Sequence, residues 1–264
     1  MMRALWSSAS GMMAQQKHID IISNNIANVN TVGFKGKRAD FQDLIYQVLR
    51  PAGTTNQPGA EIPTGIEIGH GTHLVATPTR FRQGDLKETA NELDLAIQGA
   101  GFFRVRLPDN SFAYTRAGTF NRDSDGRIVT VDGLPLDPEI TIAANVTPNG
   151  ISITPDGTVN VRAPEDEAFS QAGRIELFLF PNPRGLEQAG RGLFLANDAA
   201  GDVQQGTPGR DGLGRVQSQM LEMSNVQIVD EMVGLIVTQR AYEVNSKSIQ
   251  TADEMLGIAN NLRR

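Results

Sequence analysis

The chain has 264 residues, with 24 Lys and Arg against 30 Asp and Glu, a net charge of -6 at pH 7, and no cysteine. A chain of this length holds one large domain or two small ones around a hydrophobic core. The acidic balance argues against a nucleic-acid binder, which is normally basic, and the lack of cysteine excludes disulfides, thiolate metal sites and a cysteine nucleophile.

The first 30 residues predict an amphipathic helix. Apolar residues recur there mostly every three or four positions, which is the spacing of one helix face. The stripe comprises Leu5, Ala9, Met12, Ile19, Ile22, Ile26 and Val29. Four asparagines crowd its end, and Gly33 is the expected stop. Fraying of the helix and hydrogen bonding between subunits both remain open as explanations of these asparagines.

No part of the sequence approaches 18 consecutive apolar residues, so no bilayer-spanning helix is predicted. The N-terminus also lacks the continuous apolar segment of a secretory signal peptide. We therefore expect a chain that stays in the cytosol or is exported without cleavage of a signal.

Two different segments follow the first helix. Residues 34–50 have mixed helical character and stop at Pro51, which predicts a short hinge helix. Residues 51–73 are rich in Gly, Pro and Thr, and they show no periodicity. Their composition is that of a flexible linker or an extended loop, although the segment is long for a loop.

Residues 74–220 predict antiparallel β-structure. Short runs rich in β-branched and aromatic residues alternate with turn dipeptides, at spacings near those of hairpins. The expected strands are 102–107, 127–131, 140–142, 151–153, 159–161 and 174–180. The expected turns contain Asp125-Gly126, Asp132-Gly133, Asn149-Gly150 and Asp156-Gly157.

The C-terminal segment predicts a second amphipathic helix. Ser224 and Gln227 have the spacing of a capping box just before an apolar run. One stripe comprises Val226, Val229, Val233 and Ile236, and a longer one comprises Leu235, Tyr242, Ile249, Ala252, Leu256 and Ala259. Because two such helices flank a β-rich body, we expect them to form a joint coiled coil.

The predicted fold is therefore α+β, with terminal helices in a coiled coil and a central antiparallel β-rich domain. The expected parts are a terminal helix over 1–33, a hinge helix and extended stretch over 34–73, a β-rich domain over 74–220, and a second terminal helix over 221–264.

The sequence offers no positive evidence for catalysis, a cofactor or a metal. His70 and His73 form an H-x-x-H pair without a third ligand. The segment 121–126 has the opening letters of a calcium loop, but Asp132 stands where that loop needs Glu, and a hairpin turn explains the same letters. An enzyme or ligand-binding β-domain with oligomerising ends would require a pocket with converging polar groups.

Four blocks of the sequence resemble the bacterial flagellar rod and hook proteins. They are ISNNIANVNTVGFK (22–35), LDLAIQGAGFFRV (93–105), AYTRAGTFNRDSDGRIVTVDGLPL (113–136) and VTQRAYEVNSKSIQTADEMLGIANNL (237–262). They appear in the order of the family and are spread across nearly the whole length of the chain. The opening MMRALW and GAEIPTGIEIGHG (59–71) are most similar to the distal-rod members, with a proximal-rod or hook subunit as the alternative.

The resemblance implies a self-assembling structural subunit that forms a hollow helical drive shaft and carries torque from motor to hook. It implies export through the flagellar type III apparatus without a cleaved signal, and a place in the basal body from periplasm to outer membrane. The implied partners are other copies of the chain, proximal-rod subunits below, hook subunits above, and the P-ring and L-ring bushing proteins. No nucleic acid is expected.

Three sets of residues acquire expected roles. The polymerisation interface is expected to comprise Leu5, Met12, Ile19, Ile22, Ile26, Val29, Val229, Val233, Ile236, Tyr242, Ile249 and Leu256. The resemblance implies that Phe41 and Ile45 form an export-gate element, although packing of Phe41 in a hinge helix explains the same pattern. It also implies that 51–73, with Pro51, Pro58, Pro63, Ile66 and Ile68, keeps the rod straight, where composition alone indicates a flexible linker.

Overall fold

The structure is a computed structural model that describes residues 2–53, 55–57, 60–61, 63–143, 145–147, 150–162 and 168–261. The chain divides into two compact units. The helix unit contains 1–27, 37–79 and 227–264, and the β unit contains 28–36 and 80–226. Pro58 of the expected rod-straightening stretch lies outside the described residues.

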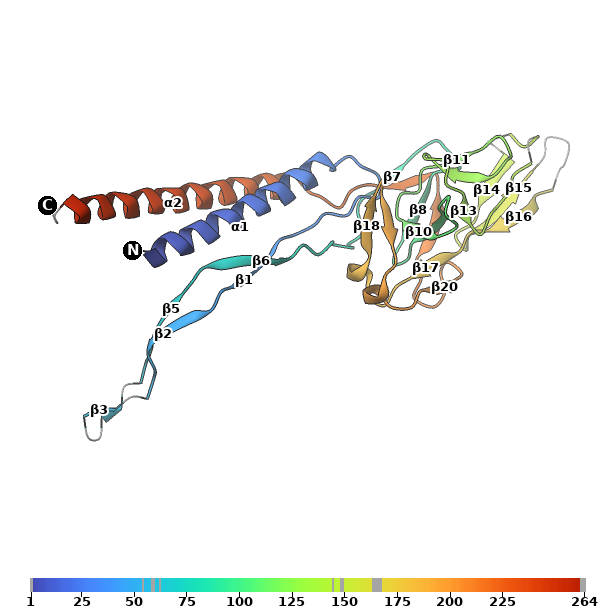
Figure 1. Cartoon of the computed structure of the whole chain (residues 1–264). Helices are drawn as coiled ribbons and strands as arrows, with labels where there is room; N and C mark the ends of the chain where they lie inside the picture. Colours follow the sequence, from blue (N-terminus) through green and yellow to red (C-terminus); the bar gives the residue numbers. More distant parts are fainter. Residues whose placement is uncertain are drawn as a thin grey trace. The chain divides into compact units, whose positions relative to one another are not determined.

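Two antiparallel helices run side by side in the helix unit (Figure 1). They are α1 (Met2–Ala27) and α2 (Ile228–Asn261). As the residue number rises along α1, the number of its neighbour on α2 falls by the same amount. The neighbours are Ser8 with Ser248, Gly11 with Asn245, His18 with Thr238, and Ile22 with Gly234. The two predicted helices are thus confirmed, whereas a coiled coil remains an expectation.

The predicted capping box at Ser224 is wrong. Helix α2 begins only at Ile228, because Ser224 is buried in the β unit and its hydroxyl accepts a hydrogen bond from the Val226 amide at 3.3 Å. The first helical bond runs instead from the Glu231 amide to the Gln227 carbonyl.

The predicted hinge helix over 34–50 is also wrong, because this segment forms one side of a long β-hairpin that we call the arm (residues 40–76). The arm contains β1 (Asp40–Asp43), β2 (Tyr46–Arg50), β3 (Thr55–Gln57), β4 (Ala60–Glu61), β5 (Ile66–Gly69) and β6 (Thr72–Ala76). Strand β1 pairs with β6, β2 with β5, and β3 with β4, all antiparallel. Pairing with the returning strands overrides the weak helical pattern.

The β unit contains short antiparallel strands. They are β7 (Leu86–Glu88), β8 (Leu95–Gln98), β9 (Phe103–Arg106), β10 (Phe112–Thr115), β11 (Phe120–Arg122), β12 (Ile128–Thr130), β13 (Leu136–Asp137), β14 (Ile151–Ile153), β15 (Thr158–Val161), β16 (Ser170–Arg174), β17 (Leu177–Leu179), β18 (Glu187–Gly190), β19 (Leu193–Leu195), β20 (Gln204–Gly206), β21 (Arg215–Ser218) and β22 (Met220–Glu222). The largest sheet has the order β13-β9-β10-β19-β18, and a second has β14-β15-β16. Two 3-10 turns, Pro183–Gly185 and Asp198–Ala200, join some of these strands.

Most predicted strands are confirmed in the β unit. The exception is 140–142, where only an isolated bridge joins Thr141 to Arg127, while Ile140 and Ile142 are buried in the main core. The hairpin between β11 and β12 turns at Gly126, whose φ of 82° is left-handed, and Arg127 pairs with both Asp123 and Asp125. The calcium-like letters therefore form a turn closed by an ion pair.

Candidate assembly surface

Helix α2 presents a covered side to α1. Ile22 of α1 and Ala252 and Thr238 of α2 are buried, and the Ile22 side chain lies beside Gly234 of α2. The side of α2 that faces α1 is therefore already covered within the single chain.

Hydrogen bonds between side chains set the register of this pair. The Ser8 hydroxyl donates to the Ser248 hydroxyl at 3.2 Å, and His18 Nδ1 lies 3.2 Å from the Thr238 hydroxyl oxygen. Thr238 donates its only hydroxyl proton to the Gly234 carbonyl at 2.7 Å, so His18 Nδ1 is the donor to Thr238. Burial lowers the pKa of His18, against the opposing charge of Glu231.

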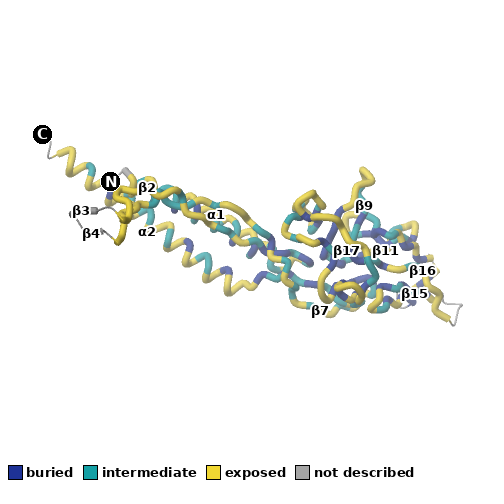
Figure 2. The backbone as a smooth tube through the Cα atoms, turned by 90° about the horizontal axis from the view of Figure 1, so that it is seen from below, coloured by how far each residue is buried: buried dark blue, intermediate teal, exposed yellow. Residues whose placement is uncertain are grey.

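The opposite side of α2 carries a second apolar stripe, which we call the outer stripe. It comprises Val229, Val233, Ile236, Val237, Val244, Met255 and Ile258. Val229 is 72% exposed and Val244 69% exposed, and Figure 2 shows α2 alternating between covered and exposed residues along its length. A helix that is apolar on two sides is typical of a buried position. In the single chain, the outer stripe has no cover among the described residues.

The predicted interface residues divide between these surroundings. Ile22 is buried, and the half-buried ones are Leu5, Met12, Ile19, Ile26, Ile249 and Leu256. The exposed ones are Val229, Val233, Ile236 and Tyr242. Val29 lies past the end of α1, in the β unit, and is half-buried.

Sequence reasoning missed several exposed apolar residues of the two helices. They are Trp6 and Met13 of α1, and Ile228, Met232, Val237, Val244, Met255 and Ile258 of α2. Their spacing was visible in the sequence. Only the pairing of α1 with α2 shows that these residues lie away from the side on which the two helices cover each other.

The arm exposes apolar side chains as well. Ile45 is 85% exposed, and its carbonyl oxygen lies 2.9 Å from His70 Nδ1. Phe41 is partly exposed, and its ring makes an edge-to-face contact with the His18 ring, with 5.6 Å between the ring centres. Both residues of the expected export-gate element are therefore accessible on a β-hairpin, where a helix had been predicted.

The base of the arm packs along α1. The Thr72 amide donates to the Ser10 hydroxyl at 3.3 Å, and Gly71 comes so close that a Cβ there would lie 2.0 Å from Ser10 Oγ. A hollow of about 250 Å³ between the two is lined by Met13, Lys17 and Leu74, among others. Further out, Pro51, Pro63, Ile66 and Ile68 are exposed.

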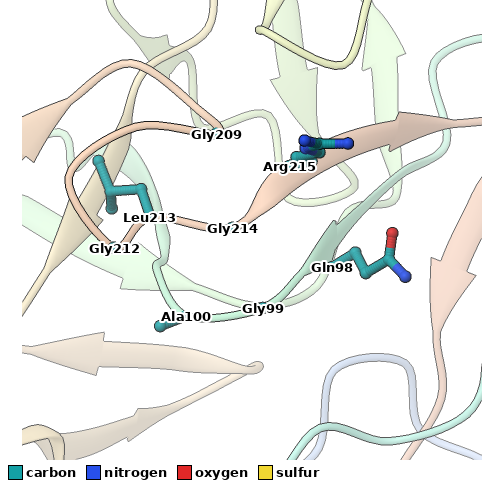
Figure 3. Close-up of a pocket in the computed structure, with 8 residues that line it drawn as sticks. All are labelled: Gln98, Gly99, Ala100, Gly209, Gly212, Leu213, Gly214 and Arg215. Atoms are coloured by element: carbon teal, nitrogen blue, oxygen red, sulfur yellow. The ribbon is translucent and has the colours of Figure 1, made fainter.

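The β unit has a hollow of about 380 Å³ (Figure 3). Its lining residues are Gln98, Gly99, Ala100, Gly209, Gly212, Leu213, Gly214 and Arg215. Half of them are glycines, and Arg215 is the only ionisable one. Such a lining lacks the converging polar groups of a catalytic site.

Neither a metal-ligand cluster nor a membrane-spanning helix is found among the residues that the structure describes. No group of three or more His, Cys, Asp and Glu side chains is placed to hold a metal ion in that part of the chain. Neither of the described helices is long and apolar enough to cross a membrane.

Comparison with known families places three matches along the chain. Residues 5–35 match the flagella basal body rod protein family, 96–161 match the flagellar hook protein FlgE/F/G D1 domain, and 217–262 match the flagellar basal body rod FlgEFG protein C-terminal family. These regions include most of α1, strands β9, β10 and β13 of the largest sheet, and α2.

Whole-chain relatives agree with these matches. The flagellar basal-body rod protein FlgG of Borreliella burgdorferi is 48% identical over 264 residues, covering 100% of both chains. The protein of the same name from Caulobacter vibrioides is 45% identical over 263 residues, covering 99% of this chain and 100% of the relative. That from Bacillus subtilis is 38% identical over 270 residues, covering 100% of both.

Proposed function

Because this chain belongs to the FlgG family of flagellar basal-body rod proteins, and so is a structural subunit of that rod, we propose that its copies build the distal rod as a hollow helical polymer. The polymer carries torque from the motor to the hook. The outer stripe of α2 is the observation that carries the proposal, because this surface is apolar along much of the helix and uncovered in the subunit.

Burial of the outer stripe supplies the driving force for assembly. Fully burying a Val or Ile side chain is worth about 1.5–3 kcal/mol. Since α1 and α2 are already helical and paired in the subunit, little ordering of the backbone opposes this gain. In the polymer, the helices of neighbouring copies pack as an inner coiled-coil layer around the channel, and the β units form the outer layer.

Contacts between unlike surfaces extend the polymer. A head-to-tail contact that does not close into a ring generates a helical filament. Proximal-rod subunits continue this filament below and hook subunits above, while the P-ring and L-ring proteins surround it from the periplasm to the outer membrane. The chain reaches this place through the flagellar type III export apparatus, without a cleaved signal, and Phe41 and Ile45 are the residues presented to the export gate.

The arm stiffens the polymer by packing between neighbouring copies. A two-stranded hairpin is marginally stable by itself, and much of this one is exposed, including Val48, Leu49 and Ile66. If adjacent subunits packed on the arm, they would bury these side chains and restrict the movement of one copy relative to the next. A straight, rigid shaft follows from that packing.

Deleting residues 51–73 is expected to give a bent, hook-like polymer or none, because β2 then loses its partner β5 and β1 loses Thr72 and His73 of its partner β6. Electron microscopy of isolated basal bodies would measure the curvature. Deleting only 54–62 is the matched control, which keeps the β1–β6 and β2–β5 pairs and should retain a straighter rod. An unchanged straight rod after the longer deletion would remove the arm's role and favour the proximal-rod alternative.

A cryo-EM reconstruction of the purified polymer tests the proposal as a whole. We expect α1 and α2 to line a central channel, with the outer stripe covered by a neighbouring copy. If the helices lie on the outer surface, or if the outer stripe stays exposed in the polymer, the proposed function is wrong.

A further inference from the structure

We propose that Lys35 is a positioning residue that passes load between the helix unit and the β unit, an inference that rests on the proposed function. The chain passes between the two units four times, after Ala27, Gly36, Thr79 and Val226. These four passages are the covalent connections between the two units, so load can pass along the chain through them. Two of the four begin or end in the short segment 28–36.

Lys35 fastens this segment inside the β unit. Its side chain is 1% exposed. Its Nζ donates to Glu222 Oε1 at 2.5 Å and to the Arg82 carbonyl at 2.9 Å. Glu222 stands shortly before the passage at Val226, and Arg82 shortly after the passage at Thr79. One ammonium group thus joins the chain next to three different passages.

Neighbouring hydrogen bonds complete the same cluster within the β unit. The Gly33 amide donates to the Glu222 carbonyl at 2.7 Å, and the Gly36 amide donates to Asn225 Oδ1 at 2.9 Å. Asn225 Nδ2 in turn donates to the carbonyls of Arg80 and Arg82. The chain near three of the four passages is therefore held on the β-unit side by one connected set of hydrogen bonds.

The charges of the cluster favour a role in positioning over one in stability. Glu222 is fully buried and also pairs with Arg116, so two cations share one carboxylate. Replacing both partners of a buried ion pair by apolar groups often leaves stability unchanged, whereas removing one partner is costly when it leaves a buried charge unpaired. Removing Lys35 leaves Glu222 and Arg116 balanced one to one, so the β unit should stay folded. The substitution removes the hydrogen bonds from Lys35 Nζ to Glu222 and to the Arg82 carbonyl, which hold segment 28–36 in place.

The test replaces Lys35→Met in the full-length chain, in cells that lack their own copy. We expect the variant to polymerise and to melt close to the wild-type temperature. Amide hydrogen exchange at Gly33 and Gly36 should accelerate by about tenfold or more, which corresponds to about 1.4 kcal/mol of lost local protection. Swimming speed should fall more steeply than in wild type as the viscosity of the medium is raised.

Lys87→Met is the matched control, because Lys87 is a lysine on β7, the strand that pairs with the Glu222-bearing strand β22, but its side chain is exposed. It should change neither exchange nor the response to viscosity. Unchanged exchange in Lys35→Met, a wild-type response to viscosity, or the same defects in Lys87→Met would each overturn the inference. So would failure of Lys35→Met to polymerise, because Lys35 would then act on assembly itself. The proposed function fails separately, if Val233→Asp still forms rods.

Discussion

Glu222→Gln is expected to lower the free energy of unfolding of the β unit by about 3–5 kcal/mol, the usual cost of breaking a buried ion pair from one side. The substitution leaves Lys35 and Arg116 buried without a counter-charge. Burial already lowers the pKa of both groups, and Glu222 is what opposes that effect. A urea titration read by pulse proteolysis of the β unit would measure the loss.

The pH dependence of the Glu222→Gln variant provides a second readout. Without the Glu222 charge, burial lowers the pKa of Lys35 further in the folded variant, while its pKa in the unfolded chain keeps the usual value. At a pH between the folded-state pKa and the unfolded-state pKa, the unfolded chain therefore binds more protons than the folded chain. Stability then rises with pH through this window. We expect Glu222→Gln to recover part of its stability as the pH is raised through that alkaline range, while the wild type gains less.

Lys35→Met is the control for Glu222→Gln, because both substitutions remove the ion pair between Lys35 and Glu222. Only Glu222→Gln leaves two cations unbalanced, so its loss of stability should be clearly larger. Equal losses in the two variants would show that the lost Lys35–Glu222 ion pair sets the stability, and that the unbalanced charge does not.

Val233→Asp is expected to abolish polymerisation while the subunit stays folded. Val233 is 55% exposed in the subunit and lies on the outer stripe, away from the side of α2 that meets α1. In the polymer the new carboxylate would be buried without a partner, which costs several kcal/mol at each contact. Sedimentation of the assembled protein would measure polymer formation, and circular dichroism would confirm that the helices persist.

Gln250→Asp is the matched control for Val233→Asp, since Gln250 is exposed on α2 but lies outside the outer stripe. It introduces the same charge into the same helix and should leave polymerisation intact. Rods of normal length from Val233→Asp would contradict a coiled-coil layer built on this face. Ile26→Asp and Leu256→Asp should also stop assembly, but both residues are half-buried within the subunit, so those variants would disturb the helix pair as well.

Local patterns were sufficient for the helices and for most strands. The period of the apolar residues predicts α1 and α2, and β-branched runs on either side of the Asp156-Gly157 turn predict β14 and β15. These features depend on neighbours within a few positions, which one sequence displays directly. The boundary of α2 was missed because Ser224 is held by the β unit before it can cap a helix.

The arm was not predictable in this way. Residues 46–50 become a strand only because residues 66–69 return to pair with them, and the intervening Gly- and Pro-rich composition resembles that of a linker. A hairpin of this length depends on a ladder between distant residues. Its placement on α1 through Thr72 and Ser10 has no local signal at all.

The sequence by itself determined that the chain has two helical ends with apolar stripes, a β-rich middle, and the motifs of the flagellar rod and hook proteins. Only the tertiary structure decided which apolar residues remain open, because α1 covers one side of α2 and leaves Val229 and Val233 outside. It alone brought Lys35 to Glu222 across 187 positions. The physical reason is the same in both cases: burial is a property of the folded chain, and no local pattern encodes which distant segment provides the cover.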